Sequence, residues 1–288
     1  MKKGIRSLIA GLLFSILWAS ASTATKIGLQ AVQPFVICIT RFFLAGLLMI
    51  AIGHFLLGQR LPKGREWGRI ALYGLLSNTL YLGLYVLAMR QVSAGLGALA
   101  VATNPVFINL LAVLFLRERL KSATLLSLLL CMSGVLLAAW PLLRNNAATP
   151  IGLLLLLTSM VAYSVSVLYF SRVDWKDLHL LVVNGWQVLL GGVFLLPIVL
   201  FTYTPAFNHW NGKALGSIGW LAIAVSIGAV QLWLYLLRED AARSSFWLFL
   251  CPVFGFILSN IFTGEPITAY TLGGMALVIA GIYRQRRV

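Results

Sequence analysis

One arginine lies well inside a long apolar segment, since Arg41 stands among the hydrophobic residues of the stretch 34–57. At a rise of 1.5 Å per residue it is roughly 10 Å from the start of that helix. A charge at membrane depth is costly, so such a residue is a functional candidate by default. We predict that Arg41 pairs with a substrate carboxylate or with helix carbonyls. The alternative is a structural arginine that snorkels or holds helices together.

Two other apolar segments carry polar and aromatic side chains: Asn78, Tyr81 and Tyr85 in the first, and Gln231, Trp233 and Tyr235 in the second. In the first segment, spacings of three and four place all three side chains on one helical face. In the second, the glutamine and the tyrosine are four residues apart. Polar groups facing lipid would be costly, so we expect both groups to face inward. They predict either a cavity wall for a small amphiphilic substrate or hydrogen bonds between helices.

Several kinds of chemistry have no matching pattern in the sequence. All seven Asp and Glu residues lie at the ends of apolar segments or between them, so no mid-membrane carboxylate is available to relay protons. Coupling would have to use a carboxylate at a helix end or the charge of the substrate, and a facilitator is the alternative. No nucleophile–base pair, phosphate loop or metal-ligand spacing occurs. We therefore expect no enzyme activity, no cofactor and no metal site.

The composition indicates a membrane protein. Of 288 residues, 60% are hydrophobic and 10% are charged, which is more apolar surface than a soluble domain of this size can bury. The net charge of +15 would suggest nucleic acid in a soluble protein, but the basic residues lie in short segments between apolar runs. The expected partners are therefore a lipid bilayer and a small-molecule substrate, not nucleic acid. The sequence allows a monomer and leaves the oligomeric state open.

The chain divides into ten apolar runs long enough to cross a bilayer. They are about 5–25, 34–57, 69–89, 93–116, 122–141, 151–171, 180–202, 214–237, 243–263 and 268–284. If the N-terminus is cytoplasmic, 17 of the 22 Lys and Arg residues fall on the cytoplasmic side. This positive-inside bias predicts an all-α integral membrane protein with both termini in the cytoplasm.

The two halves of the chain share residues at nearly constant separations. The equivalent pairs are Pro105 and Pro252, Glu118 and Glu265, and Gly134 and Gly281, each 147 residues apart; Arg41 and Gln187, 146 apart; and Trp18 and Tyr163, 145 apart. We predict two five-helix repeats, residues 1–145 and 146–288. Because five is odd, the second repeat is inverted in the membrane, as in alternating-access transporters.

The repeat also suggests which residues bend and close the bundle. Pro105 and Pro252 each remove a backbone donor in mid-span, so we predict kinks that serve as hinges, although passive kinks are equally compatible. Asn104 beside the first proline could satisfy a freed carbonyl or contact substrate. Glu118 and Glu265 close their spans as predicted gate residues or as solvated helix ends.

Small residues four apart in the fifth and tenth spans predict close helix packing there. The pairs are Gly134 with Ala138, and Ala276 with Ala280.

The whole chain resembles the drug/metabolite transporter superfamily, in its ten-helix EamA-type branch. The resemblance rests on Trp18, Pro34, Arg41-Phe42, Asn104-Pro105-Val106, Arg117-Glu118-Arg119-Leu120, Gly134, Pro252, Glu265 and Gly281. It implies a bundle of five plus five helices around a central cavity, and export of a metabolite, amino acid or drug.

We therefore expect a secondary transporter of the bacterial inner membrane, whose substrate site includes Trp18 and Tyr163 besides the residues above. The alternatives are a flippase for lipids or lipid-linked sugars, and a non-transporting receptor or assembly subunit.

Overall fold

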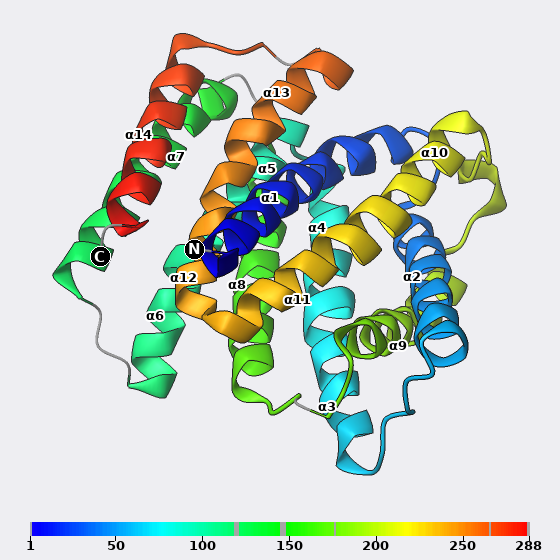
Figure 1. Cartoon of the computed structure of the whole chain (residues 1–288). Coiled ribbons are helices and arrows are strands. Elements are labelled where there is room, and N and C mark those ends of the chain that lie inside the picture. Colours follow the sequence, from blue (N-terminus) through cyan, green and yellow to red (C-terminus); the bar gives the residue numbers. More distant parts are fainter. Residues whose placement is uncertain (1, 118–120, 145–147, 176, 265, 287–288) are drawn as a thin grey trace.

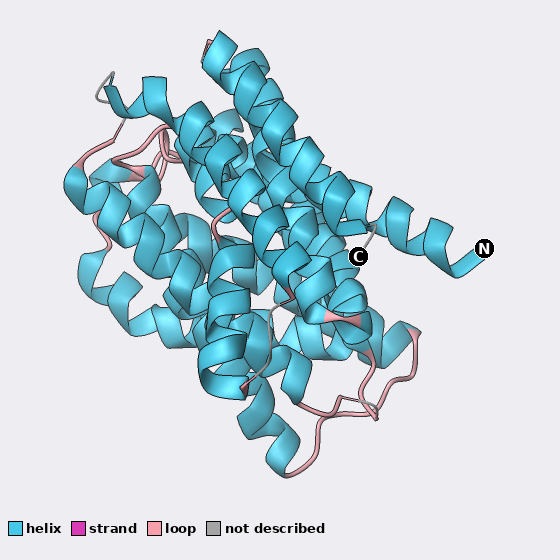
Figure 2. Cartoon of the chain, turned by 90° about the vertical axis from the view of Figure 1, so that its left-hand side faces the viewer, coloured by secondary structure: helices cyan, strands magenta, loops and turns pink. Residues whose placement is uncertain are grey.

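The computed structural model describes residues 2–117, 121–144, 148–175, 177–264 and 266–286, and it is built from helices joined by short loops (Figures 1 and 2). The α-helices are α1 Lys2–Gly28, α2 Pro34–Ala51, α3 Arg65–Gly74, α4 Tyr81–Met89, α5 Ala94–Val101, α6 Asn104–Leu116, α7 Ser122–Arg144, α8 Pro150–Arg172, α9 Leu180–Thr202, α10 Gly212–Trp220, α11 Val230–Glu239, α12 Ala241–Ser245, α13 Cys251–Thr263 and α14 Ala269–Arg286. Five shorter π- or 3-10 segments complete the set: η1 Ile52–Leu56, η2 Leu75–Leu80, η3 Pro205–Phe207, η4 Leu221–Ala229 and η5 Phe246–Leu250.

The prediction of an all-helical membrane protein is confirmed. Within the described residues, nine helical segments are long and apolar enough to cross a bilayer, and they coincide with the first nine predicted spans. The tenth predicted span is also a helix, α14, but it is not among those nine. Its C-terminal turn carries Arg284 and Arg286, which lower the hydropathy of the whole segment.

The ends of the helices follow local capping rules. The side chains of Ser93, Thr149, Asn211 and Asp240 each accept a hydrogen bond from a backbone N–H in the first turn of the following helix. Proline occupies the first turn of α2 and α8, where its missing donor costs nothing. These signals set the boundaries between spans independently of the apolar pattern within them.

Two helix pairs form opposite edges of the bundle in Figure 1, with α7 against α14 on one side and α2 against α9 on the other. Between them, α1 packs along α10, η4, α11 and α13, and α8 packs along α4, η2 and α6. The central layer therefore brings together helices from both halves of the chain.

The close approach of α7 to α14 corrects one prediction. A Cβ on Gly274 would meet the carbonyl oxygen of Gly134 and would lie 2.8 Å from the Cβ of Ala138. The two backbones therefore touch, and the facing residue on α14 is Gly274. The predicted pair, Ala276 and Ala280, is exposed on the other side of α14. Both faces of this helix carry small residues, so residue size alone did not identify the buried face.

The third and eighth spans each contain a π-helical segment, η2 and η4. A π-helix adds a residue to a turn, loosens the backbone ladder and often occurs at functional sites. The sequence analysis did not predict these two irregularities. Their positions correspond in the two halves, because Leu75 and Ala222 are 147 residues apart.

The predicted proline kinks are instead breaks between consecutive helices. α5 ends at Val101, residues Ala102 and Thr103 form a turn, and Pro105 lies in the first turn of α6. In the ninth span the 3-10 segment η5 precedes Pro252, which lies in the first turn of α13. The prolines therefore start new helices, where an unpaired N–H would be free anyway, and they interrupt no continuous ladder. That the helices hinge at these breaks remains a prediction.

Candidate functional site

Arg41 lies in the middle of α2 and its side chain is only 2% exposed. Its Nε and Nη2 atoms donate to the hydroxyl of Ser226 in η4, at 3.2 and 2.9 Å. The guanidinium carbon also lies 5.5 Å from the centre of the Phe42 ring. The arginine therefore joins the second span to the eighth through a neutral partner, and no helix carbonyl is among the hydrogen bonds found for it.

A small cavity adjoins this arginine near the centre of the bundle. Its volume is about 20 Å³, which is room for about one water molecule. Its walls include four of the predicted site residues together with serine and small residues: Trp18, Ser22, Arg41, Tyr81, Tyr85, Ala98, Val101 and Val225. This cavity is too small for a metabolite in this conformation, so a metabolite would fit beside Arg41 only if the surrounding helices separated.

Six aromatic rings form a continuous cluster beside the cavity: Phe14, Trp18, Tyr81, Tyr85, Tyr163 and Trp233. Trp233 stacks on Phe14 with the ring centres 4.7 Å apart and 18° between planes. Tyr163 lies 4.6 Å from the ring of Tyr81 and 5.7 Å from that of Trp18. The first, third, sixth and eighth spans therefore meet through these rings, and the two repeat counterparts Trp18 and Tyr163 touch.

A buried polar network continues from the arginine across four spans. Gln187 in α9 accepts hydrogen bonds at its Oε1 atom from the side chains of Ser77, at 2.7 Å, and Asn78 in η2. Its Nε2 atom donates to Asn184 Oδ1 at 3.0 Å, and Asn184 Nδ2 donates to the Ser226 carbonyl at 3.0 Å. Gln187 thus contacts the π-helix of the third span much as its counterpart Arg41 contacts that of the eighth.

Asn78 and Gln187 therefore belong to this network between helices and not to the cavity wall. Both were predicted to bind substrate, and their described hydrogen bonds are internal. Asn104 is likewise fully buried, where its Nδ2 atom lies 3.3 Å from the sulfur of Met160 and its Oδ1 atom accepts from Ser164 at 3.3 Å. It joins α6 to α8.

The predicted inward stripe on the eighth span is wrong in part. Trp233 is 1% exposed, whereas Tyr235 is 36% exposed and lies on the outer surface. Residues two apart on a helix point in nearly opposite directions, so both could not face the core. Gln231 lies between these extremes, partly exposed but with a buried Oε1 atom. The predicted gate residues Glu118 and Glu265 lie outside the described residues.

Polar contacts close the end of the bundle that carries the loops 29–33, 90–93 and 203–211, here called the loop end. Lys26 donates to the carbonyls of Met89, at 2.9 Å, and Val92, at 2.7 Å. The side chains of Gln33 and Asn208 bond each other and the neighbouring backbone, with the Gln33 N–H 2.9 Å from Asn208 Oδ1. These contacts join the first, second, third and seventh spans.

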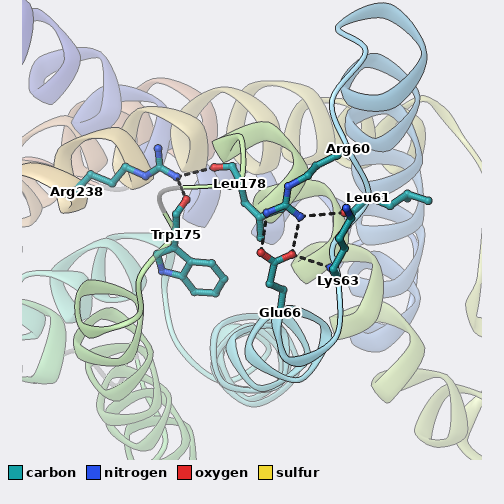
Figure 3. A network of polar contacts seen from close by, with 7 residues as sticks. All are labelled: Arg60, Leu61, Lys63, Glu66, Trp175, Leu178 and Arg238. Atoms are coloured by element: carbon teal, nitrogen blue, oxygen red, sulfur yellow. Dashed lines mark hydrogen bonds and ion pairs between the residues drawn. The ribbon is translucent and has the colours of Figure 1, made fainter.

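The opposite end, which carries the start of α1 and the loop residues 57–64, 173–175 and 177–179, is here called the terminal end. Figure 3 shows Arg238 donating to the carbonyls of Trp175, at 3.1 Å, and Leu178, at 2.9 Å. Nearby, Arg60 and Glu66 form a two-pronged ion pair, with a shortest N–O distance of 2.7 Å. The hydrogen bond and charge of Glu66 raise the pKa of Arg60 above its usual value.

Sequence reasoning missed Phe14, Ser22 and Ser226. Phe14 stands four residues before Trp18, a spacing that could have placed it on the same face. The serines carry no comparable signal, because serine is common in membrane helices. Among the described residues, no group of three or more His, Cys, Asp or Glu side chains is placed to hold a metal ion.

Comparison with known proteins agrees with this architecture. The EamA-like transporter family matches residues 5–140 and again residues 150–284. An uncharacterized transporter of Archaeoglobus fulgidus is 27% identical over 92% of this chain and 93% of its own length. The uncharacterized inner membrane transporter YedA of Escherichia coli K12 is 24% identical over 94% of this chain and 88% of its own.

Two further similarities involve a longer relative and a solved structure of lower sequence identity. A chloroplastic WAT1-related protein of Arabidopsis thaliana is 27% identical over 92% of this chain and 66% of its own. A crystal structure with 19% sequence identity superposes with a TM-score of 0.76, covering 98% of each chain, and it shows the fold alone. The relatives' names agree with a multi-pass membrane transporter. Because the family match covers nearly the whole sequence, the chain belongs to the EamA-like transporter family.

Proposed function

We propose that this protein is a secondary transporter that exports a small carboxylate-bearing metabolite, an amino acid or a related amphiphile, across the bacterial inner membrane. The observation that carries the proposal is Arg41, a buried cation in the wall of a closed central cavity. A buried charge at this depth costs free energy unless an opposite charge pairs with it, and a carboxylate forms strong charge-assisted hydrogen bonds with a guanidinium.

The proposed topology has ten spans, with α14 as the tenth and both termini in the cytoplasm. The repeats are residues 1–145 and 146–288. α6 and α13 support this division, because they begin at Asn104 and Cys251 and end at Leu116 and Thr263, both 147 residues apart. Each is followed by a residue in the left-handed conformation, Arg117 or Gly264.

In this proposal the two closed ends open in turn. Breaking the Lys26 and Gln33–Asn208 contacts would expose the cavity at the loop end, and breaking the Arg238 contacts would expose it at the terminal end. The π-helices η2 and η4 adjoin the polar network, so they are the proposed flexing points.

The test is counterflow into liposomes that contain the purified chain, using labelled amino acids and other carboxylates, with protein-free liposomes as the control. We expect saturable exchange of at least one carboxylate. If the folded protein moves no member of a broad panel, the transporter proposal is wrong, and a receptor or assembly subunit becomes the better explanation.

A further inference from the structure

The charge of Arg41 is uncompensated within the described part of the protein. It is the one charged side chain among the buried residues, and its hydrogen bonds go to a neutral serine. The described carboxylates, Glu66, Asp174, Asp177, Glu239 and Asp240, lie at the terminal end. A buried cation without a carboxylate favours a ligand that brings a negative charge.

The same surroundings disfavour a ligand that also carries an ammonium group. In an α-amino acid the ammonium sits one carbon from the carboxylate, so it would lie close to the guanidinium. Like charges in a poorly solvated site repel strongly, and no described acidic side chain is there to offset them. The site therefore distinguishes an anion from a zwitterion.

The aromatic cluster offers flat apolar surfaces next to this charge. Tyr163 and Trp233 are nearly parallel, with 23° between their planes and 6.3 Å between their centres. Trp18 and Tyr81 contact Tyr163 and also line the cavity beside Arg41. When the helices separate, a planar body could stack on these rings while its charged end stays at the arginine.

Two polar atoms in the cluster have no partner. The hydroxyl of Tyr163 and the indole Nε1 of Trp233 are buried and make no hydrogen bond in this conformation. Buried donors are rarely left unpaired, and those in a native protein call for an explanation. The two side chains are neighbours without completing a hydrogen bond, so a ligand oxygen or a water could accept from the indole N–H, which can only donate.

We propose that the transported substrate is a small planar organic anion, an aromatic monocarboxylate without an ammonium group. Its carboxylate pairs with Arg41, and its ring stacks in the cluster of Trp18, Tyr81, Tyr163 and Trp233. This inference rests on the proposed transport function and narrows its substrate class to carboxylates other than amino acids. Each cycle then moves one negative charge out of the cell. A membrane potential of 100 mV, negative inside, therefore favours an outside-to-inside concentration ratio of the anion of about 50.

The test uses the full chain in liposomes with four labelled probes that differ in charge or ring. They are 3-phenylpropanoate, phenylalanine, 2-phenylethylamine and hexanoate. We expect 3-phenylpropanoate to exchange at least roughly 10-fold faster than the other three, after subtraction of flux through protein-free liposomes. With an inside-positive potassium diffusion potential of about 100 mV, it should accumulate inside by about 50-fold.

The outcomes separate the two proposals. The anion class would be overturned if phenylalanine moved as fast as 3-phenylpropanoate or faster. It would also be overturned if the accumulation of 3-phenylpropanoate did not depend on the membrane potential. Either result would leave the transporter proposal intact. Lack of movement of all four probes, together with movement of some other metabolite, would also overturn this inference alone. If the folded protein transported none of the metabolites tested, both this inference and the transporter proposal would be overturned.

Substitution of Tyr163→Phe keeps the ring and removes the unpartnered hydroxyl. We expect the half-saturating concentration of 3-(4-hydroxyphenyl)propanoate, whose ring oxygen can accept a hydrogen bond from this hydroxyl, to rise about 10-fold. The melting temperature of the empty protein should not fall, because the hydroxyl has no partner to lose. Tyr270→Phe on the exposed surface of α14 is the matched control. Unchanged affinity, or a destabilised protein with unchanged affinity, would refute the placement of the ring in this cluster.

Discussion

Replacing Arg41 with glutamine should weaken transport without weakening the fold. The guanidinium makes its two hydrogen bonds to Ser226, so its remaining N–H groups are available to a carboxylate. Loss of one charge-assisted hydrogen bond costs about 1.5–3 kcal/mol, which corresponds to about a 10- to 150-fold rise in KM. No other buried cation in the described residues could substitute.

The fold should tolerate this change because glutamine is already present at the counterpart position. Gln187 accepts a hydrogen bond from Ser77 of η2 through its side-chain Oε1 atom. A glutamine at position 41 would present the same kind of amide to Ser226 of η4, where its Nε2 atom can donate in place of the guanidinium. Removing an unpaired buried charge is often neutral or stabilising. We therefore expect the melting temperature in detergent to stay equal or rise while KM increases.

The assay is counterflow KM in liposomes together with thermal unfolding of the same preparations. Ser226→Ala is the matched variant: it removes the neutral partner and keeps the charge, so its KM should change less than that of Arg41→Gln. Unchanged transport combined with a lower melting temperature would refute the reasoning and make Arg41 a packing residue. A larger KM effect in the serine variant would show that the orientation of the guanidinium matters more than its charge.

Four further substitutions test the packing and the loop end. Gly274→Val should lower the melting temperature, because a Cβ at this position meets α7 and overpacking costs about 1–3 kcal/mol. Gly216→Ala is the control: a Cβ there meets no neighbouring atom, so the better helix propensity of alanine should raise stability by up to about 1 kcal/mol. Asn208→Ala removes the acceptor of the Gln33 N–H, so hydrogen exchange in the loop 203–211 should quicken by about 5- to 30-fold. Lys26→Met removes an ammonium from the carbonyls of Met89, at the end of α4, and Val92, in the loop 90–93, so faster hydrogen exchange there is expected. Unchanged exchange would exclude Lys26 from closing the loop end.

The sequence determined the helical membrane architecture and the buried arginine. Apolar runs predicted the nine helices that, within the described residues, are long and apolar enough to span, because a bilayer requires about 20 apolar residues for each crossing. Arg41 was identified because a charge within such a run is rare. The shared proline and glycine positions pointed to two related halves before any geometry was known.

The tertiary structure alone decided which polar residues meet the cavity. Asn78 and Asn104 bond neighbouring helices, Tyr235 faces outward, and Phe14 enters the aromatic cluster. The physical reason is that lipid is as apolar as the protein core, so the apolar pattern of a membrane helix does not mark its inner face. The π-helices and the nearly closed cavity likewise arise from packing between distant segments, which the spacing of residues along one helix does not encode.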